Sequence, residues 1–189
     1  MESDWEVEFG PDAPVIEALW PGFIDLRRTP ERIEEIEEAR RFPMLRQALL
    51  RVNGTDSSVG IAKAESNLWT AKCDVWVPEE CDPDEMDATL AESACGLACY
   101  IDLLPREALV FAGLDEAEQP ARSTVSRLRR AACRCCRADL VIRRAFAGNL
   151  EGMGITAYIA ACGANEDAVR NAFSAAIATV AEKLEAGSA

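Results

Sequence analysis

The sequence predicts an α+β fold: two layers, in which helices pack mainly on one face of an antiparallel sheet. Runs with strand-like alternation occur in neighbouring pairs, and a run with helical periodicity follows each pair. This order occurs twice, over 59–101 and again over 136–185. Hairpins that are each followed by a helix favour an antiparallel sheet with the helices on one side. We therefore expect a core built from two hairpin–helix units over 55–189.

The first 54 residues are expected to form one strand and several helices that pack on this core. The run 4–9 alternates polar and apolar residues throughout, which predicts a half-buried strand. A short helix is expected over 13–20. Two further helices are expected over 32–42 and 44–52, and Asn53-Gly54 has the residues that commonly end a helix.

The first hairpin–helix unit is expected to have strands over 59–64 and 68–77. Glu65-Ser66-Asn67 lies between these runs and is polar, so we assign it to the turn. The segment Asp82-Pro83-Asp84-Glu85 has the composition of a capping box. It predicts a helix that continues to about Ile101.

The second unit is preceded by a helix over about 121–132. Strands are expected over 136–147 and 154–162, with the turn near Gly148. Asn165 is the expected N-cap of the last helix, with acidic residues in its first turn. Its apolar stripe consists of Val169, Phe173, Ala176, Ile177, Val180 and Leu184. No linker or low-complexity tract divides the chain, so we expect a single domain over 1–189.

Composition excludes several protein classes. Apolar residues make up 49% of the chain and charged residues 28%, as in a globular protein. No stretch approaches the roughly 20 apolar residues that span a bilayer, so no membrane partner is expected. The acidic N-terminus lacks the basic and apolar regions of a secretory signal. We therefore expect a cytoplasmic protein with free thiols.

The formal net charge of −13 argues against nucleic-acid binding, which requires a basic surface. Charge is nevertheless uneven along the chain. Residues 79–92 hold seven carboxylates, whereas 122–144 hold eight arginines and one acid, Asp139. These segments are either solvated faces that attract each other or, for the arginines, a patch that holds an anionic ligand.

The chain has no histidine, and this absence removes whole classes of chemistry. Ser-His-Asp and Cys-His machinery and His-Glu-x-x-His zinc sites are all excluded. No phosphate-binding glycine motif is found, and no cofactor is expected. No residue stands out as catalytic, which favours a non-catalytic protein.

The eight cysteines fall into different groups. Cys73 and Cys136 lie on the apolar faces of their predicted strands, and Cys162 ends a strand. All three are expected to pack in the core. Cys95 and Cys99 lie at i and i+4 of the predicted helix, on the face away from its apolar stripe. This face is either buried on both sides, a subunit interface, or a thiol pair for metal or redox chemistry.

Cys133 and Cys135 complete the set of four candidate reactive thiols. Cys135 is the best candidate for reactivity, because Arg134 and Arg137 would stabilise its thiolate. A zinc site made of the four candidates would lack the usual spacing of two close pairs. Metal binding is therefore disfavoured, and no metal site is predicted.

The candidate ligand-binding site is the second face of the sheet, away from the core. The first hairpin would contribute Lys72, Asp74 and Trp76, and the second Arg137, Asp139 and Arg143, with Tyr158 and Thr156 joining where the register agrees. Such a face is either a salt-bridged surface or a groove for an anion, with Trp76 as an apolar contact. It could equally be a dimer face.

Function is predicted only in outline. The favoured hypothesis is a cytoplasmic, non-catalytic binding or assembly module, a homo-oligomer that binds a small anionic ligand or its own copies. The alternative is a cysteine-dependent redox or metal-binding protein. A small enzyme that uses Asp, Lys or Arg is a third possibility.

Overall fold

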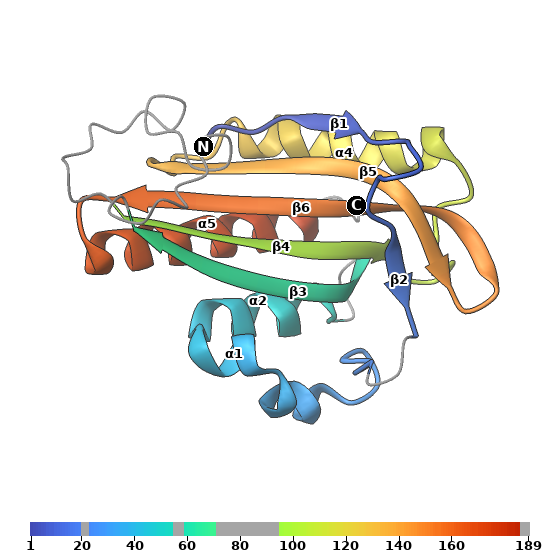
Figure 1. The fold of residues 1–189 in the computed structure, drawn as a ribbon, viewed down its shortest axis with the longest axis horizontal. Helices are drawn as coiled ribbons and strands as arrows, with labels where there is room; N and C mark the ends of the chain where they lie inside the picture. The colour runs from blue at the N-terminus through green and yellow to red at the C-terminus, as the bar shows by residue number, and fades with distance from the viewer. Residues whose placement is uncertain (20–22, 55–58, 71–94, 186–189) are drawn as a thin grey trace.

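A computed structural model describes residues 1–19, 23–54, 59–70 and 95–185, with the backbone alone at 59–70, Cys95 and Glu185. Six strands form one sheet in the order β1-β5-β6-β4-β3, and β2 also pairs with β5 (Figure 1). The predicted combination of helices with a sheet is confirmed. The strands are β1 Trp5–Val7, β2 Ile16–Ala18, β3 Val59–Thr70, β4 Cys95–Pro105, β5 Cys136–Ala147 and β6 Leu150–Gly163. The helices are η1 Pro30–Glu35, α1 Glu37–Arg41, α2 Pro43–Val52, α4 Leu114–Leu128 and α5 Glu166–Glu185.

The sheet is mixed, and the prediction of a purely antiparallel sheet was wrong. Strands β3, β4, β6 and β5 pair antiparallel in turn, but β1 and β2 both run parallel to β5. These two short strands precede β5 by more than 100 residues, so no hairpin fixes their direction. The N-terminal strand was predicted correctly. Residues 16–18 form β2 in place of part of the helix expected over 13–20.

The hairpin β5–β6 agrees with the sequence prediction. Its register runs from Cys136 opposite Ala161 to Ala147 opposite Leu150. Gly148 closes the turn with a φ of 63°, a conformation that glycine adopts without the steric cost of a side chain. Helix α5 follows, and the Asn165 side chain accepts a hydrogen bond from the Ala168 N–H at 2.9 Å.

The first predicted unit is wrong in two respects. Residues 65–67 form no turn, because β3 continues through them and pairs with β4. Residues 95–101, assigned to a helix, belong to β4. The capping box and an apolar stripe at helical spacing suggested a helix. Alternate residues from Leu97 to Leu103 are nevertheless buried, because β4 pairs with a strand on each side. Two hairpin–helix units are therefore not confirmed. Residues 71–94 lie outside the described part of the chain.

The main core lies between the helices and one face of the sheet. Figure 1 shows α4 and α5 behind the sheet, with α5 across β6 and β4 and α4 beside β5. The predicted stripe of α5, from Val169 to Leu184, is entirely buried in this core. Helix α2 matches its prediction and packs on α5, whereas the helix expected over 32–42 is broken at Ile36 into η1 and α1. In the described ranges, none of the helices has both the length and the apolar character needed to cross a bilayer.

Alternation along the strands leaves a different set of side chains on the opposite face. Core residues such as Leu140, Ala157 and Ile101 alternate with the polar residues Arg143, Thr156 and Asp102. A small second cluster also lies on this face, made of Ile16, Leu104, Val110, Ala145 and Ala147. The candidate site lies beside that cluster.

Candidate functional site

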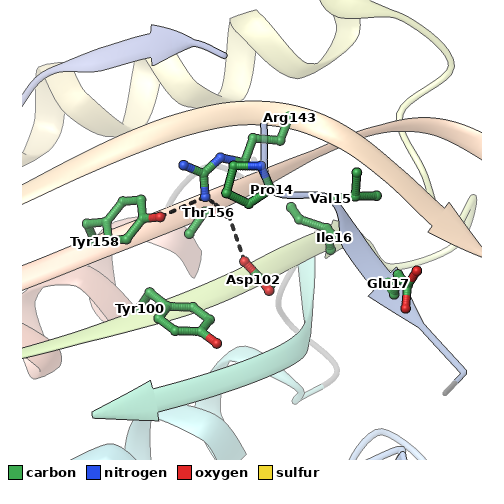
Figure 2. A pocket seen from close by; sticks show the side chains of 9 residues that line it. All are labelled: Pro14, Val15, Ile16, Glu17, Tyr100, Asp102, Arg143, Thr156 and Tyr158. Carbon is green, nitrogen blue, oxygen red and sulfur yellow. Dashed lines mark hydrogen bonds between the residues drawn. The ribbon is translucent and has the colours of Figure 1, made fainter. Parts of the chain in front are cut away.

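A pocket of about 560 Å³ lies on this second face of the sheet (Figure 2). Strands β4, β6 and β5 form its floor, and the segment that leads into β2 forms one wall. The lining residues are Pro14, Val15, Ile16, Glu17, Tyr100, Asp102, Arg143, Thr156 and Tyr158.

The register of the sheet brings the polar residues of the floor together. Asp102 lies opposite Thr156, and Tyr100 lies opposite Tyr158. Because residues two apart point to the same face, all four side chains face the pocket. Arg143 lies opposite Gly154, two residues before Thr156 on β6. The floor is thus a product of strand pairing between segments that are distant in sequence.

Gly154 allows β2 to approach the sheet. A Cβ atom at this position would lie 2.8 Å from Cδ1 of Ile16 and 2.9 Å from Cδ2 of Leu104. Ile16 also packs in the small apolar cluster and is 1% exposed. A larger residue at 154 would therefore push β2 outward and displace the wall of the pocket.

Arg143 is the central charged group of the site. Its side chain is only 8% exposed, whereas that of Glu8, its ion-pair partner just after β1, is 39% exposed. The Arg143 Nε donates to Glu8 Oε2 at 2.8 Å, and Nη2 donates to the same oxygen. Nη1 donates to the Tyr158 hydroxyl at 2.7 Å and lies 3.4 Å from Thr156 Oγ1.

A chain of hydrogen bonds extends from Arg143 to a second carboxylate. Thr156 is 1% exposed, and its hydroxyl donates to Asp102 Oδ1 at 2.7 Å. A hydroxyl can accept one hydrogen bond while it donates another, so Thr156 links the guanidinium to Asp102. Glu8 and Asp102 thus lie at the two ends of a chain that has Arg143 at its centre.

The charged state of Arg143 is stabilised in spite of its burial. Burial lowers the pKa of the guanidinium, but hydrogen bonds to Tyr158 and Glu8 outweigh this effect and raise the pKa overall. The guanidinium carbon also lies 5.2 Å from the centre of the Tyr158 ring, within the range of a cation–π contact. Arg143 is therefore a permanent cation held by internal partners.

Two tyrosines give the pocket an aromatic side. The rings of Tyr100 and Tyr158 are 6.2 Å apart between centres and tilted by 51°. Both side chains are half-buried, so each presents part of a ring and a hydroxyl group. Together with Val15 and Ile16 they provide apolar surface around the charged groups.

Two of the predicted ligand-binding residues, Arg143 and Tyr158, lie in this pocket. Arg137 and Asp139 lie further along β5 and form an ion pair with each other at 2.5 Å. The Asp139 carboxylate also accepts a hydrogen bond from the Asp4 N–H at 2.8 Å. Lys72, Asp74 and Trp76 lie outside the described residues.

The arginine-rich segment 122–144 covers the end of α4, the loop that follows it and most of β5. Several of its arginines pair with acids from different elements of the chain. The ion pairs are Arg122–Glu118, Arg129–Asp4, Arg137–Asp139, Arg143–Glu8 and Arg144–Glu151. None of these acids belongs to the segment 79–92, which lies outside the described residues, so the expected attraction between the two segments stays a prediction.

The pair Cys95/Cys99 does not lie on an exposed helix face, because both residues belong to β4. Cys99 is 5% exposed in the core, and burial raises the pKa of its thiol. Cys136 and Cys162 are buried, as expected for core residues. Among the described residues, no group of three or more Cys, Asp or Glu side chains is arranged to hold a metal ion.

Cys133 and Cys135 are both half-buried, and each interacts with a buried thiol: Cys133 with Cys136, and Cys135 with Cys162. The Cys133 sulfur lies 3.2 Å from that of Cys136. The sequence interpretation grouped Cys133 with Cys135 and placed Cys136 in the core, so it missed this pair. The signal was present in the spacing Cys133-Arg134-Cys135-Cys136, in which the first and last residues form a Cys-x-x-Cys motif.

Sequence reasoning also missed Tyr100, Asp102 and the segment 14–17 as lining residues of the pocket. It missed Glu8 as the ion-pair partner of Arg143. The alternation of Leu97, Cys99, Ile101 and Leu103 with polar or small residues was the available signal for β4. No local pattern indicates which strand β2 pairs with, because its partner lies about 130 residues away.

No family model, curated protein or solved structure matches this chain.

Proposed function

We propose that this chain is a non-catalytic binding module that holds a small polar molecule in the pocket on the open face of the sheet. The proposal includes the two-layer arrangement expected from the sequence, with helices on one face and the ligand on the other. The observation that carries it is the convergence of Arg143, Asp102, Tyr100 and Tyr158 from three strands on one hollow.

The size and chemistry of the pocket support ligand binding. Its volume of about 560 Å³ lies in the range typical of small-molecule sites. Such sites combine apolar lining with a few fixed polar groups, and here the polar groups are fixed by hydrogen bonds to one another. A ligand would meet a preorganised surface and would not have to order it.

The arrangement of the polar groups in the pocket favours ligand binding over catalysis. The Thr156 hydroxyl is bonded to the Asp102 carboxylate, and Thr156 is 1% exposed. A substrate cannot reach it for nucleophilic attack. Arg143 is engaged with Glu8 and Tyr158, as is typical of a group that orients a ligand.

The charge of the ligand depends on Glu8. An anion, as expected from the sequence, would have to replace Glu8 at Nε and Nη2 of Arg143. The Glu8 side chain is partly exposed, so its carboxylate can turn away from Arg143 and be hydrated when an anion takes its place. An anionic ligand should therefore bind more tightly to Glu8→Gln, whereas a neutral ligand should bind equally to both proteins.

Two measurements test the proposal. Native mass spectrometry of the untreated protein reports a co-purified small molecule, and a thermal-shift screen of polar metabolites identifies compounds that stabilise the fold.

A pair of variants tests the position of the site. Val15→Trp places a bulky group at an exposed position of the pocket wall, and Gln47→Trp places the same group at an exposed position of α2. Binding should be lost in the first variant and kept in the second. Equal binding by both variants would overturn the proposed pocket.

We propose self-association as a second function, because three exposed large apolar side chains lie close together in the sequence around β2 and a fourth lies at the turn between β5 and β6. Phe9, Val15 and Leu19 flank β2 and are 57%, 42% and 54% exposed. Leu150, at the turn of the central hairpin, is 47% exposed. Light scattering should then report a homo-oligomer that Leu150→Glu disrupts; a monomer at all concentrations would exclude this function.

A further inference from the structure

We propose that Cys133 and Cys136 are a dithiol–disulfide pair that exchanges with small disulfides, in which Cys133 attacks and Cys136 resolves. This activity is separate from the proposed ligand pocket. It rests on the distance between the two sulfurs, their unequal exposure and the opening beside them.

The local backbone brings the two thiols together. Cys135 lies between them with a φ of 58°, in the left-handed region that non-glycine residues rarely adopt. Its carbonyl accepts a hydrogen bond from the Cys162 N–H at 3.0 Å, which fixes the turn onto β6. The turn places the Cys133 and Cys136 sulfurs 3.2 Å apart, so a movement of about 1 Å would bring them to the length of a disulfide bond.

The two thiols are not equivalent. Cys136 is the first residue of β5, is 1% exposed, and lies 3.0 Å from the Arg134 carbonyl and 3.4 Å from that of Ala172. Cys133 is half-buried and borders an opening of about 260 Å³ that is lined by Met1, Glu2, the loop 131–134 and, at its inner side, the buried Cys136. A small disulfide can therefore reach Cys133, while Cys136 stays behind it.

The ionisation of the pair agrees with these roles. The hydrogen bond between the two sulfurs lowers the pKa of Cys133 to about 7. The same hydrogen bond, together with burial, raises the pKa of Cys136. The proton shared by the two sulfurs therefore stays on Cys136, and Cys133 carries the thiolate, which is the nucleophilic form.

The exchange proceeds in two steps. The Cys133 thiolate attacks one sulfur of the small disulfide, whose S–S bond breaks, and the released thiolate takes up a proton. The Cys136 thiol then loses its proton and attacks the Cys133 sulfur, which releases the second small thiol. Two electrons pass from the protein to the small disulfide, the protein gains the Cys133–Cys136 bond, and two small thiols are formed.

A digest of the full chain after equilibration with glutathione buffers tests the proposal. Trypsin cuts after Arg130, Arg134 and Arg137, so a Cys133–Cys136 bond joins peptide 131–134 to peptide 135–137. Because the second peptide also contains Cys135, the experiment is repeated with Cys135→Ser. We expect the joined peptides in both proteins, with a yield that rises with the proportion of oxidised glutathione and falls with reduced glutathione.

Two variants separate the roles of the thiols. Cys136→Ser should trap a glutathione adduct on Cys133, because the resolving thiol is gone. Cys133→Ser should take up no glutathione at Cys136, which is buried. The proposal is overturned when folded wild-type protein forms no joined peptides at any glutathione ratio, or when Cys135→Ser abolishes them. Loss of ligand binding at the Arg143 pocket has no bearing on this outcome.

Discussion

At the scale of single residues, the site is dominated by one buried cation. Arg143 is 7% exposed, and its charge is balanced by Glu8 and, through Thr156, by Asp102. A buried charge is tolerated only when its partners are in place. The partners therefore determine stability as well as ligand recognition.

Replacement of Glu8 tests this dependence. Glu8→Gln leaves the guanidinium buried without its counter-ion, and we expect a loss of about 1–3 kcal/mol in the free energy of unfolding. Tyr158→Phe removes one hydrogen bond and should cost about 1 kcal/mol. Urea denaturation measures both, and Glu6→Gln, at an exposed position of β1, is the matched control. Identical midpoints for Glu8→Gln and wild type would refute the role assigned to Glu8.

The thiol of Cys133 should show an unusual pH dependence. The hydrogen bond with Cys136 lowers its pKa to about 7, so half of it is thiolate near pH 7, whereas an ordinary cysteine reaches this point near pH 8.5. The rate of alkylation by iodoacetamide at Cys133 should therefore reach half of its maximum near pH 7. The ionisable groups beside the pair include the Met1 amino group, Glu2 and Arg134.

Peptide mapping assigns each alkylation rate to its cysteine. Cys136→Ala removes the hydrogen bond, so the pH at which the alkylation rate of Cys133 is half-maximal should rise toward 8.5. Cys99 provides an internal control, since burial raises its pKa and it should react only after unfolding. A half-maximal alkylation rate reached only above pH 8.5 in the wild-type protein would contradict the assignment of the thiolate to Cys133.

At the scale of elements, the connection between β6 and α5 depends on a glycine. A Cβ atom on Gly163 would lie 2.5 Å from the backbone nitrogen of Val169 and 2.8 Å from the carbonyl carbon of Ala168. Since both atoms belong to the backbone of α5, a side chain at 163 can fit only if the helix moves.

Gly163→Ala should therefore lower the free energy of unfolding by about 1–3 kcal/mol, as overpacking of a buried contact does. Gly10→Ala is the control, because a Cβ at that exposed position meets nothing within 4 Å. Thermal denaturation followed by circular dichroism compares the two variants. A Gly163→Ala protein as stable as Gly10→Ala would show that α5 does not pack against Gly163 as described.

The elements predicted from the sequence are those whose patterns are local. Helix α5 has a buried stripe at helical spacing, and β5 and β6 are joined by a short turn at Gly148. Strand β4 was assigned to a helix because Leu97, Ile101 and Leu104 fit a helical stripe as well as a strand face, and its two partner strands could not be known locally. The polar run 65–67 resembled a turn, yet β3 lies at the end of the strand order, where polar residues are tolerated.

The candidate site was predictable to the extent that it depends on alternation within one hairpin. Arg143 and Tyr158 were assigned to one face of β5 and β6, and the structure brings them together. Asp102 and Glu8 enter through pairing between distant segments, which no local pattern reveals. The thiol pair was missed although its spacing was visible, because Cys136 was interpreted only as a core residue.

At the scale of the whole molecule, the first residues of the chain are tied to a strand that begins at Cys136. The Ser3 hydroxyl donates to the Ala138 carbonyl at 2.5 Å, and β1 adds parallel ladder bonds to β5. The main core also combines side chains of α2, α4 and α5 with those of β4, β5 and β6. These elements therefore share one core, and we expect them to unfold together.

We accordingly expect a single cooperative unfolding transition in urea. Circular dichroism at 222 nm reports the helices, tryptophan fluorescence reports the surroundings of residues such as Trp5, and the two curves should coincide. Removal of residues 1–8 deletes β1 and the counter-ion of Arg143, so the same single transition should move to lower urea. Two separated transitions in the full chain would show that its N-terminal part and its remainder fold independently. An unchanged midpoint after the deletion would show that β1 contributes nothing to the stability of the sheet.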